Sequence, residues 1–202
     1  MRTMRSIVMR MIGFLAMLTM LCGVVYPLVV TGVAQAAFGD KARGSIIEMD
    51  GRQYGSELLA QPFTGEEYLW GRPMNIDVST YTNDGGEPLL YAGAFNKTPA
   101  GEELEAIIAE RVTAIRKAHP EKGNTPIPVD LVTGSGSGLD PHISVAAADY
   151  QIARIAQARG LSPSQVREIV LQYTDKKWLG ILGEETVNVL KVNLALDGIL
   201  KE

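Results

Sequence analysis

The feature that most constrains this chain is an apolar run of 28 residues, Met11–Phe38, that holds no Asp, Glu, Lys or Arg. As a helix, that run reaches about 42 Å, which exceeds the roughly 30 Å hydrocarbon core of a bilayer. We therefore expect a transmembrane helix over residues 11–36. Pro27 lies inside the run, where a spanning helix tolerates proline and can kink at it.

The charges that flank the run predict its orientation. Three basic residues precede it: Arg2, Arg5 and Arg10. The positive-inside rule then assigns residues 1–10 to the cytoplasm. Lys41 and Arg43 follow the run and weaken this asymmetry without reversing it. Residues 37–202 are therefore expected outside the cytoplasm.

A cleaved signal peptide is the alternative for the same segment. Ala34-Gln35-Ala36 fits the small-x-small cleavage pattern, and the basic start fits as well. Signal peptides usually have an apolar region of about 7–15 residues, and this run is much longer. We favour an uncleaved anchor, and either outcome exports the domain.

Composition limits the function of the exported part. The chain carries 19 basic and 23 acidic residues, a net charge of −4, and setting the three N-terminal arginines aside leaves −7. An acidic domain binds nucleic acid poorly, so we expect no nucleic-acid partner. Cys22 is the only cysteine, which excludes a disulfide within the chain. The only histidines, His119 and His142, lack partners at metal-ligand spacing, so no metal is expected.

A glycine- and serine-rich loop over residues 134–138 is the strongest candidate site. We predict a short buried strand over 128–133 before it and a helix over 145–159 after it, with Ser144 as N-cap and Gly160 at C′. Such a loop exposes N–H and hydroxyl donors, and it can bind an anion or dock against another surface. No Gly-Lys-Ser/Thr follows, so it is not a Walker A loop. A plain strand-to-helix connection remains open.

Catalysis is the other interpretation of this region. Ser135, Ser137, Asp140 and His142 lie close together in sequence and suggest a hydrolase. They occupy one loop, however, and Gly136-Ser137-Gly138 matches a nucleophile elbow only through glycine-serine alternation. We expect no catalytic residues, and we expect His142 to position its neighbours by hydrogen bonding.

Local patterns predict most other elements. A hairpin is expected over 45–54, because Asp50-Gly51 suits a type I′ turn. An amphipathic helix is expected over 99–119 and another after the N-cap Ser162. The predicted fold class is therefore α+β, with one N-terminal transmembrane helix followed by a single exported α+β domain.

Two segments are harder to assign. Residues 75–98 are polar and glycine-rich, and we predict a long loop with a turn at 83–88. Residues 184–200 fit both a strand and a helix, and we favour a helix opened by Glu184 and Glu185.

A series of short motifs extends from the start of the domain to the last ten residues. In chain order they are Gly55-Ser56 with Gln61, Tyr68 with Trp70-Gly71-Arg72-Pro73, Asp130-Leu131-Val132-Thr133, the run from Ser135 to Ser144, Tyr150-Gln151 with Arg154, Ala158-Arg159-Gly160, and Val187-Asn188-Val189-Leu190 with Asn193-Leu194-Ala195-Leu196-Asp197. Together they resemble the C-subunit family of the Kdp-type potassium-transporting P-type ATPases (KdpC). The chain departs from the usual Ser-Gly-Gly-Ser-Asn pattern of that family, of which only Gly85-Gly86 remains.

The resemblance implies a non-catalytic accessory subunit of a high-affinity potassium importer in the bacterial inner membrane. Its implied partners are the channel-like subunit that selects K⁺ (KdpA), the P-type subunit that hydrolyses ATP (KdpB), and membrane lipid around the helix. The implied role is to stabilise the complex, with a raised apparent ATP affinity of the pump. No cofactor is expected to bind firmly, and ATP is expected only through the complex. Direct ATP contact would require the reversed topology, and an exported membrane-anchored binding module is the other alternative.

The resemblance also suggests which residues matter. An interface or nucleotide-linked motif would comprise Ser135, Gly136, Ser137, Gly138, Asp140, His142, Ser144, Gln151 and Arg154. A second interface motif would comprise Trp70 and Arg72. From its own chemistry, Arg72 can stack on an aromatic ring or fork onto a carboxylate or carbonyl, and Trp70 suits buried packing.

Overall fold

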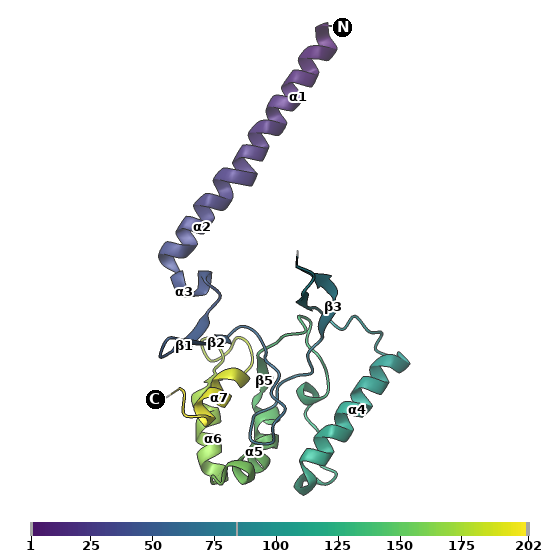
Figure 1. The fold of residues 1–202 in the computed structure, drawn as a ribbon, viewed down its shortest axis with the longest axis vertical. Helices are drawn as coiled ribbons and strands as arrows, with labels where there is room; N and C mark the ends of the chain where they lie inside the picture. The colour runs from purple at the N-terminus through teal and green to yellow at the C-terminus, as the bar shows by residue number, and fades with distance from the viewer. Residues whose placement is uncertain (1, 84, 201–202) are drawn as a thin grey trace. The chain divides into compact units, whose positions relative to one another are not determined.

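The computed structural model describes residues 2–83 and 85–200. The chain forms two compact units, Met1–Ile47 and Glu48–Glu202. The first is helical and the second mixes helices with strands (Figure 1). The predicted fold class, an apolar N-terminal helix followed by an α+β domain, is confirmed.

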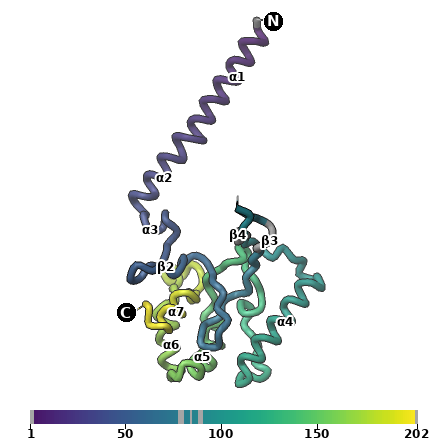
Figure 2. Tube along the Cα trace, viewed as in Figure 1, coloured from purple at the N-terminus to yellow at the C-terminus, as the bar shows by residue number. Residues whose placement is uncertain are grey.

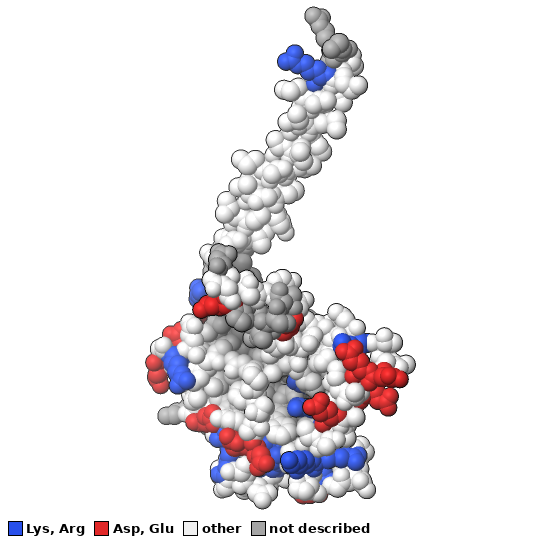
Figure 3. All heavy atoms as spheres, turned by 45° about the vertical axis from the view of Figure 1, so that its right-hand side comes forward, with Lys and Arg blue, Asp and Glu red and all other residues white. Residues whose placement is uncertain are grey.

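The first unit is dominated by one long apolar helix. It comprises α1 (Arg2–Met20), the π-helical turn η1 (Leu21–Val25) and α2 (Tyr26–Ala37), and the short α3 (Gly39–Ala42) follows. The stretch Thr3–Ala37, 35 residues, is long and apolar enough to cross a membrane. Figure 3 shows its uncharged surface between the basic start and the charged residues that follow.

Pro27 accounts for the π turn inside this helix. Proline has no N–H, so the usual hydrogen bond back to the Gly23 carbonyl cannot form. The Tyr26 N–H instead reaches the Leu21 carbonyl, five residues back. A wider turn of this kind accommodates the hydrogen bond that proline cannot make, and the helix continues through it.

The predicted hairpin at the start of the domain is confirmed. Strands β1 (Ile46–Met49) and β2 (Arg52–Ser56) pair with each other. Asp50 and Gly51 have φ angles of 53° and 75°, as a type I′ turn requires.

A second hairpin corrects the prediction of a long loop over 75–98. Strands β3 (Ile76–Thr82) and β4 (Pro88–Ala92) pair antiparallel, with a register irregularity between Asp77 and Tyr81. The turn predicted at 83–88 is present, and the Asn83 N–H donates to the Glu87 carbonyl at 2.9 Å. The polar composition hid β-branched and aromatic residues on both sides of that turn, which are the better strand signal.

Helix α4 (Glu102–Ala118) confirms the predicted amphipathic helix, although its regular part starts three residues later than expected. Acidic residues occupy its first turn, and Arg116 and Lys117 occupy its last, which suits the helix dipole. Of its side chains only Ile115 is fully buried. The helix lies at one side of the domain, apart from α5, α6 and α7 (Figure 2).

The core forms around a small sheet and three helices. Its elements are β5 (His142–Ser144), α5 (Val145–Arg159), α6 (Pro163–Gln172), β6 (Thr174–Asp175), β7 (Thr186–Asn188) and α7 (Val189–Leu196). The strand order is β5-β7-β6, antiparallel, with Val187 between Ile143 and Thr174. Val187 and Ile143 are buried, and they pack in one cluster with apolar side chains of α5 and α6. Burial of this cluster is the main stabilising term of the domain.

Capping fixes the helix ends as predicted. The Ser144 hydroxyl accepts a hydrogen bond from the Ala147 N–H at 3.2 Å and begins α5, and Gly160, at φ 65°, ends it. Ser162 and Gln165 form a capping box at the start of α6, with Pro163 in its first turn.

Two predicted elements are wrong in detail. Residues 128–133 hold the 3₁₀ turn η3 (Val129–Leu131), not a strand. Pro126 and Pro128 lack ladder donors at its start, and the Asp130 carboxylate bonds the Ser144 N–H. The helix favoured over 184–200 exists only as α7. The segment before it pairs as β7, so Asn188, not Glu184 or Glu185, caps the helix and accepts from the Lys191 N–H.

Candidate functional site

The glycine-serine loop is closed by its own hydroxyl groups. The Ser135 Oγ accepts from the Gly138 N–H at 3.0 Å, and the Ser137 Oγ accepts from the Leu139 N–H at 3.2 Å. The two hydroxyls lie 3.3 Å apart. Because these groups bond within the loop, the geometry favours docking over anion binding.

The loop packs against the segment that follows β4. A Cβ atom on Gly138, at φ 75°, would lie 2.1 Å from the Gly93 carbonyl oxygen. A Cβ on Gly134 would lie 2.1 Å from the ring of Phe95. Gly136 has open space around it, so the close approach requires glycine at 134 and 138 but not at 136.

Arg72 ties this loop to the start of α5. Its guanidinium lies 3.3 Å from the Asp130 carboxylate and donates to the Gly134 carbonyl at 3.1 Å. The other Asp130 oxygen accepts from the Ser144 N–H at 2.6 Å. The expectation that Arg72 forks onto a carboxylate or a carbonyl is confirmed, since it does both.

Asp140 and His142 lie at the edge of the same region. The Asp140 carboxylate accepts from the His142 N–H at 2.9 Å. The His142 Nε2 lies 3.4 Å from the Asp175 carboxylate and 3.4 Å from the Asn188 amide nitrogen. His142 thus lies in a hydrogen-bonding cluster that joins three strands. Over residues 2–83 and 85–200, no group of three His, Cys, Asp or Glu side chains could hold a metal ion.

Arg154 is the most heavily bonded side chain of the domain interior, and it is only 5% exposed. Its guanidinium donates to the backbone carbonyls of Gly65, Glu66 and Tyr68, and to the Gln151 side chain. It also lies 4.3 Å from the centre of the Trp70 ring. Burial lowers the pKa of Arg154 to about 10. The group stays charged at neutral pH and holds an irregular segment against α5.

Two buried amides continue this arrangement. The Gln151 side chain accepts from the Trp70 N–H at 2.9 Å and donates to the Trp70 carbonyl at 3.0 Å. The Asn193 side chain accepts from the Leu69 N–H at 2.7 Å and donates to the Leu69 carbonyl at 2.9 Å. Both amides are fully buried. We call Arg154, Gln151, Asn193 and the backbone of residues 65–70 the buried polar junction.

His119 borders the buried polar junction and holds it to the end of α4. Its Nδ1 lies 2.8 Å from the Ile115 carbonyl, and its Nε2 accepts from the Arg154 Nε at 3.1 Å. A ring that accepts at Nε2 must carry its proton on Nδ1. Burial is the main cause that lowers the pKa of His119. The ring is therefore neutral and structural.

Sequence reasoning missed the roles of Asn193 and His119. Asn193 appeared only as part of a motif, and His119 was considered only as a metal ligand. The available signal for Asn193 was an amide among the apolar residues Val192, Leu194 and Leu196, because a buried amide must find partners.

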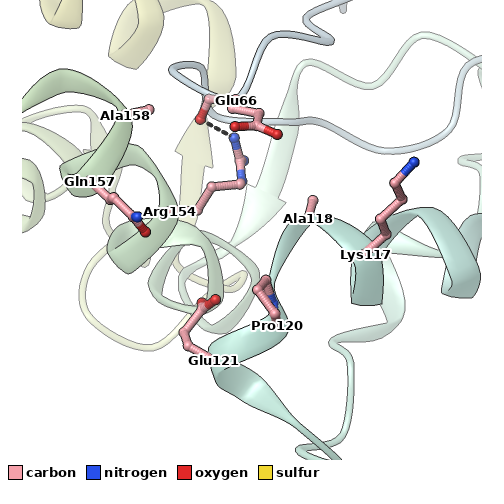
Figure 4. Close-up of a pocket in the computed structure, with 8 residues that line it drawn as sticks. All are labelled: Glu66, Lys117, Ala118, Pro120, Glu121, Arg154, Gln157 and Ala158. Carbon is pink, nitrogen blue, oxygen red and sulfur yellow. Dashed lines mark hydrogen bonds between the residues drawn. The ribbon is translucent and has the colours of Figure 1, made fainter.

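A pocket of about 420 Å³ lies beside the buried polar junction (Figure 4). Its lining includes Glu66, Glu121, Lys117 and Arg154. Arg154 reaches the backbone oxygen of Glu66 in this view, so its donors are directed at the chain itself. With the Arg154 guanidinium bonded to the chain, Lys117 is the remaining cation among these four side chains and faces two carboxylates, which makes a poor phosphate site.

The fold and the site together define a class of protein. A helix able to cross a membrane precedes a domain whose most buried polar side chains fasten its own backbone. These are the features of a domain that follows a candidate membrane helix and whose central polar network is structural.

Comparisons with known proteins identify the family. Residues 8–198 match the family model for KdpC, the c chain of the K⁺-transporting ATPase. A "Potassium-transporting ATPase KdpC subunit" of Clostridium perfringens is 59% identical over 184 residues, covering 91% of this chain and 93% of the relative. The subunit of the same name from Sorangium cellulosum is 50% identical over 188 residues, covering 91% and 93%. That from Mycobacterium tuberculosis is 46% identical over 194 residues, covering 96% and 99%. This chain belongs to the KdpC family, an accessory class and not the catalytic subunit.

Proposed function

We propose that this chain stabilises the assembly of a Kdp-type potassium importer in the bacterial inner membrane. Its partners would be the channel-like subunit and the P-type ATPase subunit, and it would catalyse no reaction alone. The observation that carries the proposal is the family match over residues 8–198, which includes both the apolar helix and the domain.

We further propose that the domain lies outside the cytoplasm. Arginines before the apolar helix support this orientation through the positive-inside rule. The helix Thr3–Ala37 is long enough to span the bilayer without further segments.

Contact with ATP would then be indirect, because ATP is cytoplasmic. The side chains of the suggested nucleotide-linked motif support this view. Gln151 is fully buried with its amide bonded to Trp70, and Arg154 bonds backbone carbonyls. Any rise in the apparent ATP affinity of the pump would pass through contacts between subunits.

Single cysteines test the orientation. In a Cys22→Ala background, Ala114→Cys places a thiol on the exposed face of α4, and Ser6→Cys places one before the apolar run. An impermeant maleimide should label Ala114→Cys on intact spheroplasts and Ser6→Cys only after lysis. The reverse pattern would overturn the orientation and restore direct ATP contact.

Purification tests the assembly role. The tagged chain, extracted from membranes in mild detergent, should bring down a P-type ATPase and a channel-like subunit with K⁺-stimulated ATP hydrolysis. The purified chain alone should hydrolyse no ATP. Recovery of the chain without these subunits, from cells that make them, would contradict the proposal and favour an exported binding module.

A further inference from the structure

The loop between β6 and β7 exposes a cluster of large apolar side chains. Trp178, Leu179, Ile181 and Leu182 are 67%, 73%, 78% and 53% exposed. We call residues 178–182 the apolar tip. A soluble surface carries single exposed apolar residues without consequence, but a contiguous group of this size marks an interaction site.

The apolar tip is an ordered turn. The Trp178 N–H donates to the Leu182 carbonyl at 2.8 Å, and the Leu182 N–H donates back to the Trp178 carbonyl at 3.0 Å. The Gly180 N–H also bonds the Lys177 carbonyl at 3.0 Å. A protrusion that is already ordered loses little conformational freedom when it docks.

Leu179 adds an independent observation. Its φ is 52°, in the left-handed region that a bulky side chain avoids. Glycine or asparagine would take this position at lower conformational cost. The fold therefore keeps Leu179 in an unfavourable backbone conformation although its side chain is mostly exposed to solvent. Strain of this kind is found where function requires it.

We propose that the apolar tip is a docking element that inserts into an apolar, uncharged socket on another subunit of the same transporter. The inference rests on the proposed function for the existence of such a partner. Tryptophan at the centre of a compact apolar group is typical of the residues that dominate interface affinity.

Charge favours a protein subunit over the two other possible occupants, an anionic lipid surface and a second copy of this domain. Lys177 pairs with Glu184 at 3.2 Å at the base of the apolar tip. Residues 175–185 hold three acidic and two basic side chains, so the base of the tip has no net positive charge to attract anionic lipid. The net charge of −7 after the N-terminal arginines opposes both an anionic lipid surface and a second copy of the domain. An uncharged socket on a protein subunit would not repel this negative charge.

A titration of the full-length chain in detergent tests the proposal. Its target is a complex of the other subunits, purified from cells that lack this chain. Ile181→Asp should bind at least tenfold more weakly, because it would bury an unpaired carboxylate. Val129→Asp changes a residue that is 66% exposed elsewhere on the domain, and it should bind within twofold of the wild type.

Leu179→Gly separates docking from folding. It removes the side chain and relieves the unfavourable φ, so the unfolding midpoint should stay equal or rise while affinity falls. A purely structural leucine would lower the unfolding midpoint, and that result would overturn the proposal.

Other results of the same titration would contradict the proposal or its premise. If the wild type binds the complex and Ile181→Asp binds equally, the apolar tip is not the docking element. If Ile181→Asp instead abolishes self-association of the chain, a second copy replaces the subunit as occupant. If the wild type itself fails to bind the complex, the proposed function fails first.

Discussion

Replacing Gln151 by leucine tests the buried polar junction most directly. The change makes the side chain apolar at a similar size, and it leaves the N–H and carbonyl of Trp70 without their partner. Arg154 also loses the Gln151 oxygen that accepts from it at 2.8 Å. An unsatisfied buried polar group costs about 1–3 kcal/mol. With two such groups and a partial gain from apolar burial, we expect a net loss of roughly 2–4 kcal/mol.

Urea unfolding of the full-length chain in mild detergent measures this loss. Trp70 is partly buried against the core and Trp178 is exposed, so the change in tryptophan fluorescence on unfolding should come mainly from Trp70. Gln157→Leu is the matched control, because Gln157 is an exposed glutamine on the same helix. It should change the free energy of unfolding by less than about 0.5 kcal/mol.

Gln151→Glu sharpens the comparison. A carboxylate keeps both acceptor bonds, from Trp70 and Arg154, and loses only the donor, so it should be less damaging than leucine. If Gln151→Leu unfolds like the wild type, or if glutamate is worse than leucine, the amide does not hold the backbone as argued.

Three further predictions follow from other parts of the site. Gly138→Ala should lose roughly 2–4 kcal/mol of stability, because φ is 75° and the new Cβ meets the Gly93 carbonyl, whereas Gly136→Ala should be close to neutral in the same unfolding assay. Burial lowers the pKa of His119, so its stabilising contribution should be complete above about pH 6.5 and lost as the pH falls through the folded-state pKa. A His119→Asn variant should show a flatter unfolding midpoint in that acid range, and an equal slope would refute the assignment. Ser137→Ala should cost about 0.5–1.5 kcal/mol and leave ATP-driven K⁺ uptake of an assembled complex intact, while lost turnover would reveal a chemical role for the hydroxyl.

Local chemistry made much of the fold predictable. The type I′ turn at Asp50-Gly51, the cap at Ser144 and the helix end at Gly160 each depend on residues close in sequence. Their physical causes, positive φ and unsatisfied helix ends, act within one turn of the chain. The long apolar helix was equally predictable, because the capacity of a helix to cross a membrane depends on its length and its lack of charge.

Where prediction failed, distant partners decided the outcome. Residues 75–98 form a hairpin because β3 and β4 pair, although their composition suggested a loop. Residues 186–188 became a strand because β5 and β6 lie on both sides of them. Neither the pairing nor its register is encoded in a short window of sequence.

By itself, the sequence determined the long apolar helix, the α+β class, the helix caps and the motifs that place the chain in its family. Only the tertiary structure decided what those motifs do. It directs Gln151, Arg154 and Asn193 at the backbone of residues 65–70, which lie more than 80 positions away in the chain. It also turns the apolar tip outward rather than into the core. The physical reason is that a buried polar group must find a partner wherever the fold brings one, and that partner is set by packing rather than by spacing.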